Sequence, residues 1–162
     1  MQEEIDLNKN EGQPKFVFIA GTPRSSGTVT LASLDDHPDI LAWPSDLIYF
    51  PFFYRIAGGR KEVPIAELNN EFIKVSFNNF RKRLEHGDGL YADDISSSAV
   101  DNHNIGNFDY QLFLRCLNAE KDKYYNAVDY LAFIFKCLKY SSSRYRDKPV
   151  KYYVLLTGAR GL

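Results

Sequence analysis

The chain of 162 residues has little cysteine and no marked charge of either sign, and each shortage argues against a class of protein. Cys116 and Cys137 lie in apolar, helix-like segments without metal-ligand spacing, so we expect buried small apolar residues rather than a disulfide or a zinc site. A formal net charge of −1 provides no overall field for nucleic acid or anionic lipid. No apolar run approaches the roughly 20 residues that cross a bilayer.

The first residues are polar and acidic, the reverse of a secretory leader. We therefore expect residues 1–14 to form a disordered or weakly held tail, and residues 15–162 to form one domain. A hydrophobic content of 44% is sufficient for a core in this domain. These features predict a soluble, cytoplasmic protein with no nucleic-acid partner and no membrane segment in this chain.

The next segments indicate a strand, a turn, a helix and a second strand. Residues 15–20, KFVFIA, are typical of a parallel strand covered on both faces. Residues 28–35 predict a helix, which His37 and Pro38 then end. The short apolar run DILAW, residues 39–43, predicts a second strand that would complete a βαβ unit and favours an α/β sheet.

The rest of the chain continues this alternation. The aromatic-rich residues 43–64 contain three prolines and are expected to form a loop with one helical turn. Residues 65–84 have a 3.6-residue apolar period and predict an amphipathic helix, and residues 85–107 predict a long loop. Further helices are predicted over 108–119 and 123–140, and a third strand over 150–156.

The turn GTPRSSGT between the first strand and the first helix has the composition of an anion site. Backbone N–H groups at a helix start have no intrahelical partners and favour a bound anion. Gly21 and Gly27 permit a tight backbone path, and Arg24 can bind a phosphate through two hydrogen bonds. Additional hydroxyl donors are available at Ser25, Ser26 and Thr28.

Two other interpretations of this turn remain open. The triphosphatase loop G-x-x-x-x-G-K-[ST] requires a lysine after its second glycine, where this chain has Thr28. The second glycine also comes one residue late, so the Mg·ATP loop fits poorly. The other interpretation is a hydrophilic turn that merely caps a helix.

The stretch FVFIAGTPRSSGTVTLASLDDHPDI resembles the 5′-phosphosulfate-binding segment of sulfotransferases that use 3′-phosphoadenosine 5′-phosphosulfate (PAPS). That family has an apolar strand, a Pro-Arg-Ser-Gly-Thr-Thr loop, a helix and then an Asp-x-His-Pro-x-Ile segment that ends the helix. The matching residues here are Pro23, Arg24, Ser25, Leu34, Asp35, His37, Pro38 and Ile40. The resemblance implies a P-loop-like fold with helices flanking a parallel sheet, and a cofactor site formed by Pro23, Arg24, Ser25, Ser26, Gly27 and Thr28.

The loop departs from the family pattern in one respect. Ser26 stands where the family has glycine and Gly27 where it has the first threonine; alternatively, SGT at residues 26–28 is the equivalent triplet with one residue added to the turn. The family's Arg-Asp-Pro segment, which holds the 3′-phosphate, does not occur before Leu162. We therefore expect the first part of an incomplete sulfotransferase domain, or a degenerate relative.

The resemblance also indicates an acceptor base. Many members have a glutamate in an acidic-x-x-Phe-Phe context after the loop, and DLIYFPFF resembles it with Asp46 at the acidic position. Asp46 would then accept the acceptor proton and Arg24 would balance charge on the leaving phosphate. The alternative role of Asp46 is a helix N-cap or a solvated loop carboxylate. His86 and His103 are alternative bases, whereas His37 is expected to be structural.

The function expected from these observations is transfer of a sulfuryl group from PAPS to a hydroxyl or amine of a carbohydrate or small molecule, without a metal. The alternatives are a P-loop kinase of small molecules and a noncatalytic relative that uses the loop for anion binding or keeps only the scaffold. A location in the Golgi would follow if the chain is a piece of a eukaryotic enzyme. The acceptor and the oligomeric state are not specified by the sequence.

Overall fold

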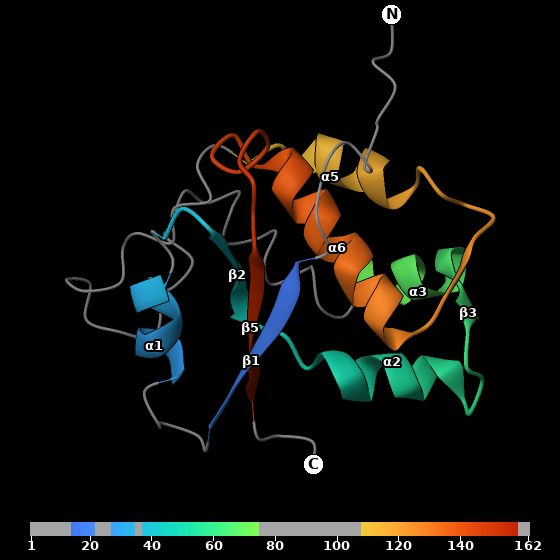
Figure 1. Ribbon diagram of the computed structural model, residues 1–162. Coiled ribbons are helices and arrows are strands. Elements are labelled where there is room, and N and C mark those ends of the chain that lie inside the picture. The colour runs from blue at the N-terminus through green and yellow to red at the C-terminus, as the bar shows by residue number, and fades with distance from the viewer. Residues whose placement is uncertain (1–13, 22–26, 35–36, 75–107, 159–162) are drawn as a thin grey trace, which may run out of the picture.

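The computed structural model describes residues 14–21, 27–34, 37–74 and 108–158 (Figure 1). It has an α/β architecture in which a short parallel sheet lies between helices. Helix α1 lies on one side of the sheet, and helices α2, α3, α5 and α6 lie on the other (Figure 1). The predicted α/β class is therefore confirmed.

Three parallel strands form the sheet in the order β1-β5-β2. Their bounds are Lys15–Gly21 for β1, Ile40–Asp46 for β2 and Tyr152–Gly158 for β5. All three predicted strands are thus confirmed, with shifts of a few residues at their ends. In the expected βαβ unit β1 and β2 would be neighbours. In the structure, β5 from the far end of the chain lies between them.

The two outer strands differ from the sequence-based expectation. β1 was expected to be covered on both faces, but Val17 is 38% exposed and Phe18 is 43% exposed, because β1 pairs with β5 along one edge. β2 continues past Pro44, beyond the predicted end of the strand. A proline is tolerated in an outer strand, and the pairing register shifts between Ala42 and Asp46.

The helices begin and end at clear local signals. Their bounds are Gly27–Leu34 for α1, Tyr49–Ala57 for α2, Ile65–Phe72 for α3, Tyr110–Leu117 for α5 and Ala127–Ser141 for α6. Asn126 caps α6, since its side-chain oxygen accepts hydrogen bonds from the N–H groups of Val128 and Asp129 at 3.0 Å. Asp109 caps α5 through Leu112 N–H at 2.8 Å. Both C-terminal helix predictions are confirmed.

Helix α2 is longer than the prediction of a loop with one helical turn over residues 43–64, because it runs for nine residues. Pro51 lies in its first turn, where the backbone N–H would have no intrahelical partner, so the helix tolerates it. The helix ends at Gly58, which has a φ of 55°, a conformation that glycine adopts readily. The buried residues of α2 are Tyr49, Phe52, Phe53 and Ala57, a helical spacing that was already present in the sequence.

Two short strands pair beside the helices. The structure also describes the first part of the predicted amphipathic helix. β3, Val63–Pro64, pairs antiparallel with β4, Tyr124–Tyr125. Within α3 the predicted inward positions Leu68 and Phe72 are fully buried, which confirms that part of the helix. The remainder of the predicted helix and the predicted loop up to residue 107 lie outside the described residues.

The main core fills the space between the sheet and α6. Phe135 of α6 stacks on Tyr153 of β5 with ring centroids 4.7 Å apart, and its ring lies 5.6 Å from that of Trp43 in β2. A buried hydrogen bond joins α6 to α3, because the Tyr130 hydroxyl donates to Asn69 Oδ1 at 3.0 Å. Among the described helices, none has the length and apolar composition needed to span a membrane.

Candidate functional site

The carboxyl ends of the three parallel strands meet at one edge of the sheet, at the lower side of Figure 1. Gly21, the last residue of β1, pairs with Gly158, the last residue of β5. Asp46, the last residue of β2, pairs with Leu156. Ligands of open α/β sheets bind beyond the carboxyl ends of the strands, so this edge is the candidate site.

The dimensions of this edge follow from the strand pairing. Two strand spacings of about 4.8 Å separate β1 from β2, and Asp46 pairs two residues before the end of β5, a further distance of about 7 Å along the strands. The backbones of Gly21 and Asp46 therefore lie about 12 Å apart. Between them the edge includes Gly158, which has no side chain to occupy the space above the sheet.

Two helices start at the same edge. α1 begins at Gly27, shortly after β1 ends at Gly21, and α2 begins at Tyr49, shortly after β2 ends at Asp46. The N-cap of α2 is Ile48, which provides no side-chain hydrogen bond to the first turn. The initial N–H groups of a helix carry a partial positive charge, so the start of α1 favours an anion at this edge. The start of α2 is less suited to an anion, because Tyr49 N–H donates to Leu47 O at 2.8 Å and Pro51 has no N–H.

The predicted cofactor-binding residues are described in part. Gly27 and Thr28 form the start of α1, so the backbone changes from strand to helix across the predicted turn. Pro23, Arg24, Ser25 and Ser26 lie outside the described residues. The alternative role of Asp46 as a helix N-cap is wrong, because Asp46 ends β2 and Ile48 is the N-cap of α2.

The aromatic residues between Trp43 and Tyr54 divide between core and surface. Trp43, Tyr49, Phe52 and Phe53 are buried, as expected of core residues. The Tyr49 hydroxyl donates to the carbonyl oxygen of Ala127, and burial raises its pKa well above the ordinary value. A buried phenol with a raised pKa remains protonated, so Tyr49 acts as a structural anchor between α2 and α6.

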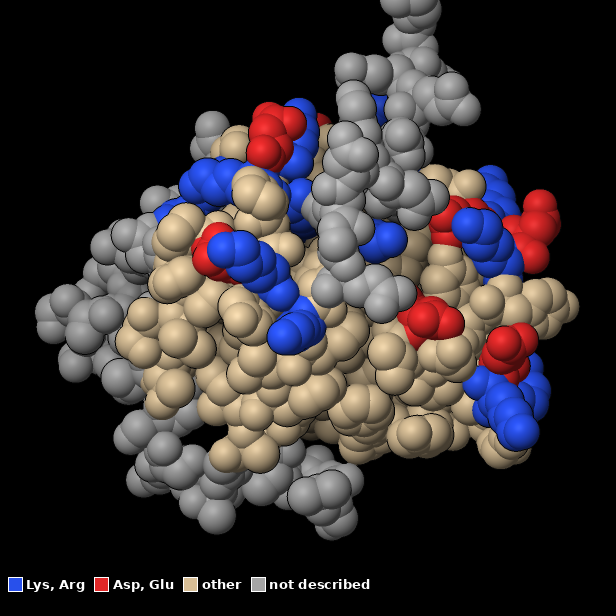
Figure 2. Space-filling view, viewed as in Figure 1, with Lys and Arg blue, Asp and Glu red and all other residues tan. Residues whose placement is uncertain are grey.

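Exposed rings lie next to the candidate site. The Phe18 ring of β1 lies 5.5 Å from the ring of Phe50, which stacks against Tyr54 at 6.4 Å. Phe18, Tyr54 and Ile48 are all exposed. Figure 2 shows an uncharged surface in its lower centre, below the charged side chains of the upper and right-hand parts. The aromatic positions of α2 therefore contribute to this surface, which the sequence-based prediction of a loop did not locate.

The predicted structural role of His37 is confirmed. Its N–H donates to Leu34 O at 3.3 Å, and its Nδ1 accepts a hydrogen bond from the N–H of Asp39 at 3.2 Å. These bonds close the turn that links α1 to β2. The alternative bases His86 and His103 lie outside the described residues.

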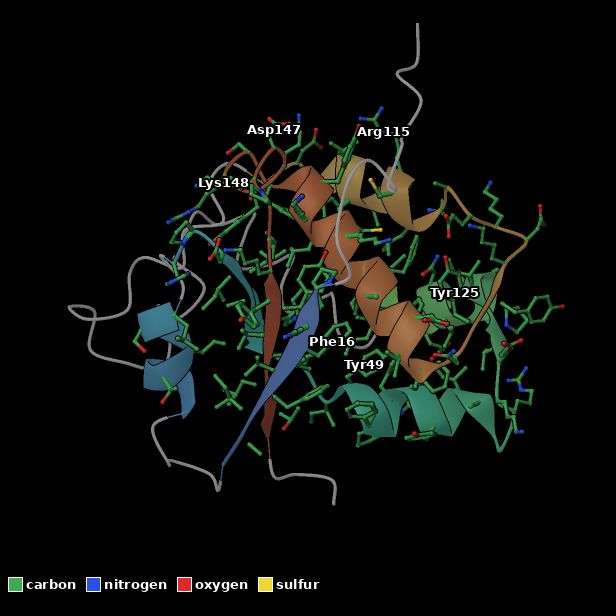
Figure 3. All side chains as sticks on the ribbon, in the orientation of Figure 1. Phe16, Tyr49, Arg115, Tyr125, Asp147 and Lys148 are labelled. Carbon is green, nitrogen blue, oxygen red and sulfur yellow. The ribbon has the colours of Figure 1, made fainter. Side chains whose placement is uncertain are left out.

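Some of the described charged side chains lie at the opposite end of the sheet. Lys148 and Asp147 follow α6 and Arg115 lies in α5, all at the upper side of Figure 3. Lys151, just before β5, pairs with Asp39 at 2.8 Å. Arg24, the cation that the sequence predicts for the candidate site, lies outside the described residues.

Cys116 and Cys137 are free and buried, as predicted. Burial raises the pKa of the Cys137 thiol well above its ordinary value, so this thiol stays protonated. Within the part of the chain that the structure describes, no group of three His, Cys, Asp or Glu residues is arranged to hold a metal ion.

Comparison with known proteins adds no relationship to this geometry. The chain matches no protein-family model, no curated protein and no solved structure.

Proposed function

We propose that this chain binds PAPS at the turn between β1 and α1 and belongs to a sulfotransferase. The observation that carries the proposal is the change from a parallel strand ending at Gly21 to a helix starting at Gly27, at the carboxyl edge of the sheet. The intervening residues include Pro23, Arg24 and Ser25, on which the resemblance to the phosphosulfate loop depends.

The donor groups of this edge fit a nucleotide with phosphate and sulfate groups. Gly27 and Thr28 offer main-chain N–H groups at the start of α1, and these suit an anion. Arg24 would balance the charge of the 5′-phosphate, and the hydroxyls of Ser25, Ser26 and Thr28 would donate to its oxygens. When bound, the nucleotide supplies a sulfuryl group attached to a phosphate leaving group.

Asp46 would act on the acceptor, a hydroxyl or amine of a carbohydrate or small molecule. Its carboxylate would take the acceptor proton as the acceptor atom bonds to sulfur and the bond from sulfur to the phosphate oxygen breaks. The spacing of about 12 Å between the backbones of Gly21 and Asp46 leaves room for the sulfuryl group and the acceptor above β5. Gly158 leaves this part of the sheet edge free of a side chain.

Isothermal titration calorimetry tests the binding step. We expect adenosine 3′,5′-bisphosphate to bind, Mg·ATP to bind more weakly, and Arg24→Ala to abolish bisphosphate binding. Arg55→Ala is the matched control, because Arg55 is an exposed arginine in the last turn of α2, and it should bind as the wild type does. Preference for Mg·ATP would favour a small-molecule kinase, and absence of binding to both would favour a noncatalytic relative.

A transfer assay tests the catalytic role of Asp46. Radiolabelled sulfate from PAPS should pass to hydroxyl or amine acceptors with the wild type, and Asp46→Asn should lower kcat by at least about 100-fold, the usual scale of acid–base catalysis. Bisphosphate binding should be unchanged in this variant. Wild-type turnover by Asp46→Asn would assign the base to another residue.

A further inference from the structure

The edge of β1 that faces away from β5 has backbone hydrogen-bonding groups without partners among the described residues. Lys15 N–H donates to Lys151 O at 2.9 Å, so the backbone groups of Lys15 point toward β5. Because these directions alternate along a strand, the N–H and C=O groups of Phe16, Phe18 and Ala20 point away from β5. No hydrogen bond joins these groups to another part of the chain that the structure describes.

The side chains along this edge are apolar on both faces. Phe16 and Phe18 share the face toward α6 and α2, where Phe16 lies 6.2 Å from the Phe135 ring. Val17 and Ile19 share the other face, where Ile19 packs near Leu31 of α1. Lys15 is the single charged residue of β1 and lies at its first position. Exposed edge strands usually carry charges, prolines or bulges that prevent pairing, and the interior of β1 has none of these.

We propose that β1 is a self-association edge, on which β1 of a second copy of this chain pairs antiparallel around a twofold axis at Phe18. In this register Phe18 opposes Phe18 of the second copy, Phe16 opposes Ala20, and each of these residues both donates and accepts. Lys15 opposes Gly21, so no like charges face each other.

An axis at Phe18 pairs more of the outward-facing backbone groups than an axis at a neighbouring position does. An axis at Val17 or Ile19 would leave one of the three outward-facing residues without a partner on the other copy. An axis between two residues would place outward-facing groups opposite groups already directed at β5. The axis at Phe18 also brings two exposed phenylalanine rings together on the same face of the extended sheet.

A charge-exchange experiment tests both the edge and the register. Sedimentation velocity over a concentration series should show a dimer for the wild type. Phe18→Lys and Phe18→Glu should each weaken dimerisation by more than about tenfold, because like charges would face each other at the axis. An equimolar mixture of the two variants should restore the dimer, since opposite charges would then pair.

The control is Tyr124→Lys, which places the same charge at an exposed apolar residue of β4 and should dimerise as the wild type does. Circular dichroism and thermal melting of each variant verify folding. A monomeric wild type at all concentrations would overturn the proposal. So would well-folded variants that still dimerise, or a mixture that stays monomeric.

A second variant avoids any charge in the sheet. Ala20→Pro removes an N–H group that points outward, so it should prevent dimerisation while the pairing of β1 with β5 is kept. Hydrogen exchange of the wild type gives a test without substitution. The amides of Phe16, Phe18 and Ala20 should become slower at high protein concentration, whereas concentration-independent exchange of these amides would contradict the proposal.

Discussion

The two faces of the sheet are covered very differently. On one face, α2, α3, α5 and α6 enclose a large aromatic core that includes Trp43, Phe135 and Tyr153. On the other face, the described buried cluster consists of Leu31, Ala42, Val154 and Leu156, beneath α1, which is the one helix described on that face. The face covered by α2, α3, α5 and α6, here the thick face, has many buried rings in mutual contact. The face covered by α1, here the thin face, has small and aliphatic side chains in its described cluster.

This difference separates stability from the candidate site. Burial of apolar area is the main favourable term in folding, so the thick face supplies most of it. The predicted phosphosulfate turn connects β1 to α1, and α1 packs on the face with the smaller described cluster. Binding loops commonly occur where local stability is low and the neighbouring scaffold is rigid. Under the proposed function, the thick face would be the scaffold and the ligand contacts would lie on the side of α1.

The largest expected effect is on the thick face. Phe135→Ala should lower the free energy of unfolding by about 4 kcal/mol, because it removes a fully buried ring and leaves a cavity between Tyr153 and Trp43. Urea unfolding followed by circular dichroism measures this change. A loss below about 1 kcal/mol, the scale of an ordinary surface substitution, would show that the aromatic layer does not hold the sheet.

A smaller effect is expected on the thin face. Leu31→Ala should cost about 2 kcal/mol, near the lower end for a buried leucine, because the sparse cluster under α1 can close around the missing atoms. The same urea titration measures it against Phe135→Ala. If Leu31→Ala proved as destabilising as Phe135→Ala, the contrast between the two faces would fail.

The smallest expected effect concerns pH and a charged residue at the rim of the thick face. Desolvation opposes ionisation of Glu120, but hydrogen bonds from Lys123 and Tyr125 outweigh it, so its pKa lies below the ordinary value. A lowered folded-state pKa stabilises the protein above the ordinary carboxyl pKa, and this stabilisation is lost as the pH falls through the folded-state value. Glu120→Gln should reduce the acid-induced loss of stability, as measured by urea unfolding between neutral and acid pH. An unchanged pH dependence would contradict this role.

Local patterns predicted several elements well, and Pro51 explains the main failure. The apolar run at residues 15–20 and the helical period of the C-terminal segments depend on neighbouring residues, and the structure confirms them as β1, α5 and α6. Over residues 43–64, prolines were given more weight than the period of Tyr49, Phe52 and Phe53. Because Pro51 lies in the first helical turn, it does not interrupt the hydrogen bonds of α2.

The sequence predicted the parts of the candidate site that depend on neighbouring residues. It did not predict the parts that depend on pairing between distant strands. The strand before the turn and the helix start at Gly27 follow from the residues themselves. That Asp46 ends a strand at the same edge depends on its pairing with Leu156, which is far away in the sequence. The sequence contains no local signal for such a pairing.

The sequence by itself determined the alternation of strands and helices, the burial of Cys116 and Cys137, and the glycine- and hydroxyl-rich turn after β1. These depend on side-chain periodicity and backbone preference over a few residues. The tertiary structure alone decided that β5 lies between β1 and β2, which leaves the far edge of β1 without a partner strand among the described residues. The physical reason is that parallel pairing joins distant segments, and the favoured arrangement depends on how all the helices cover the sheet together.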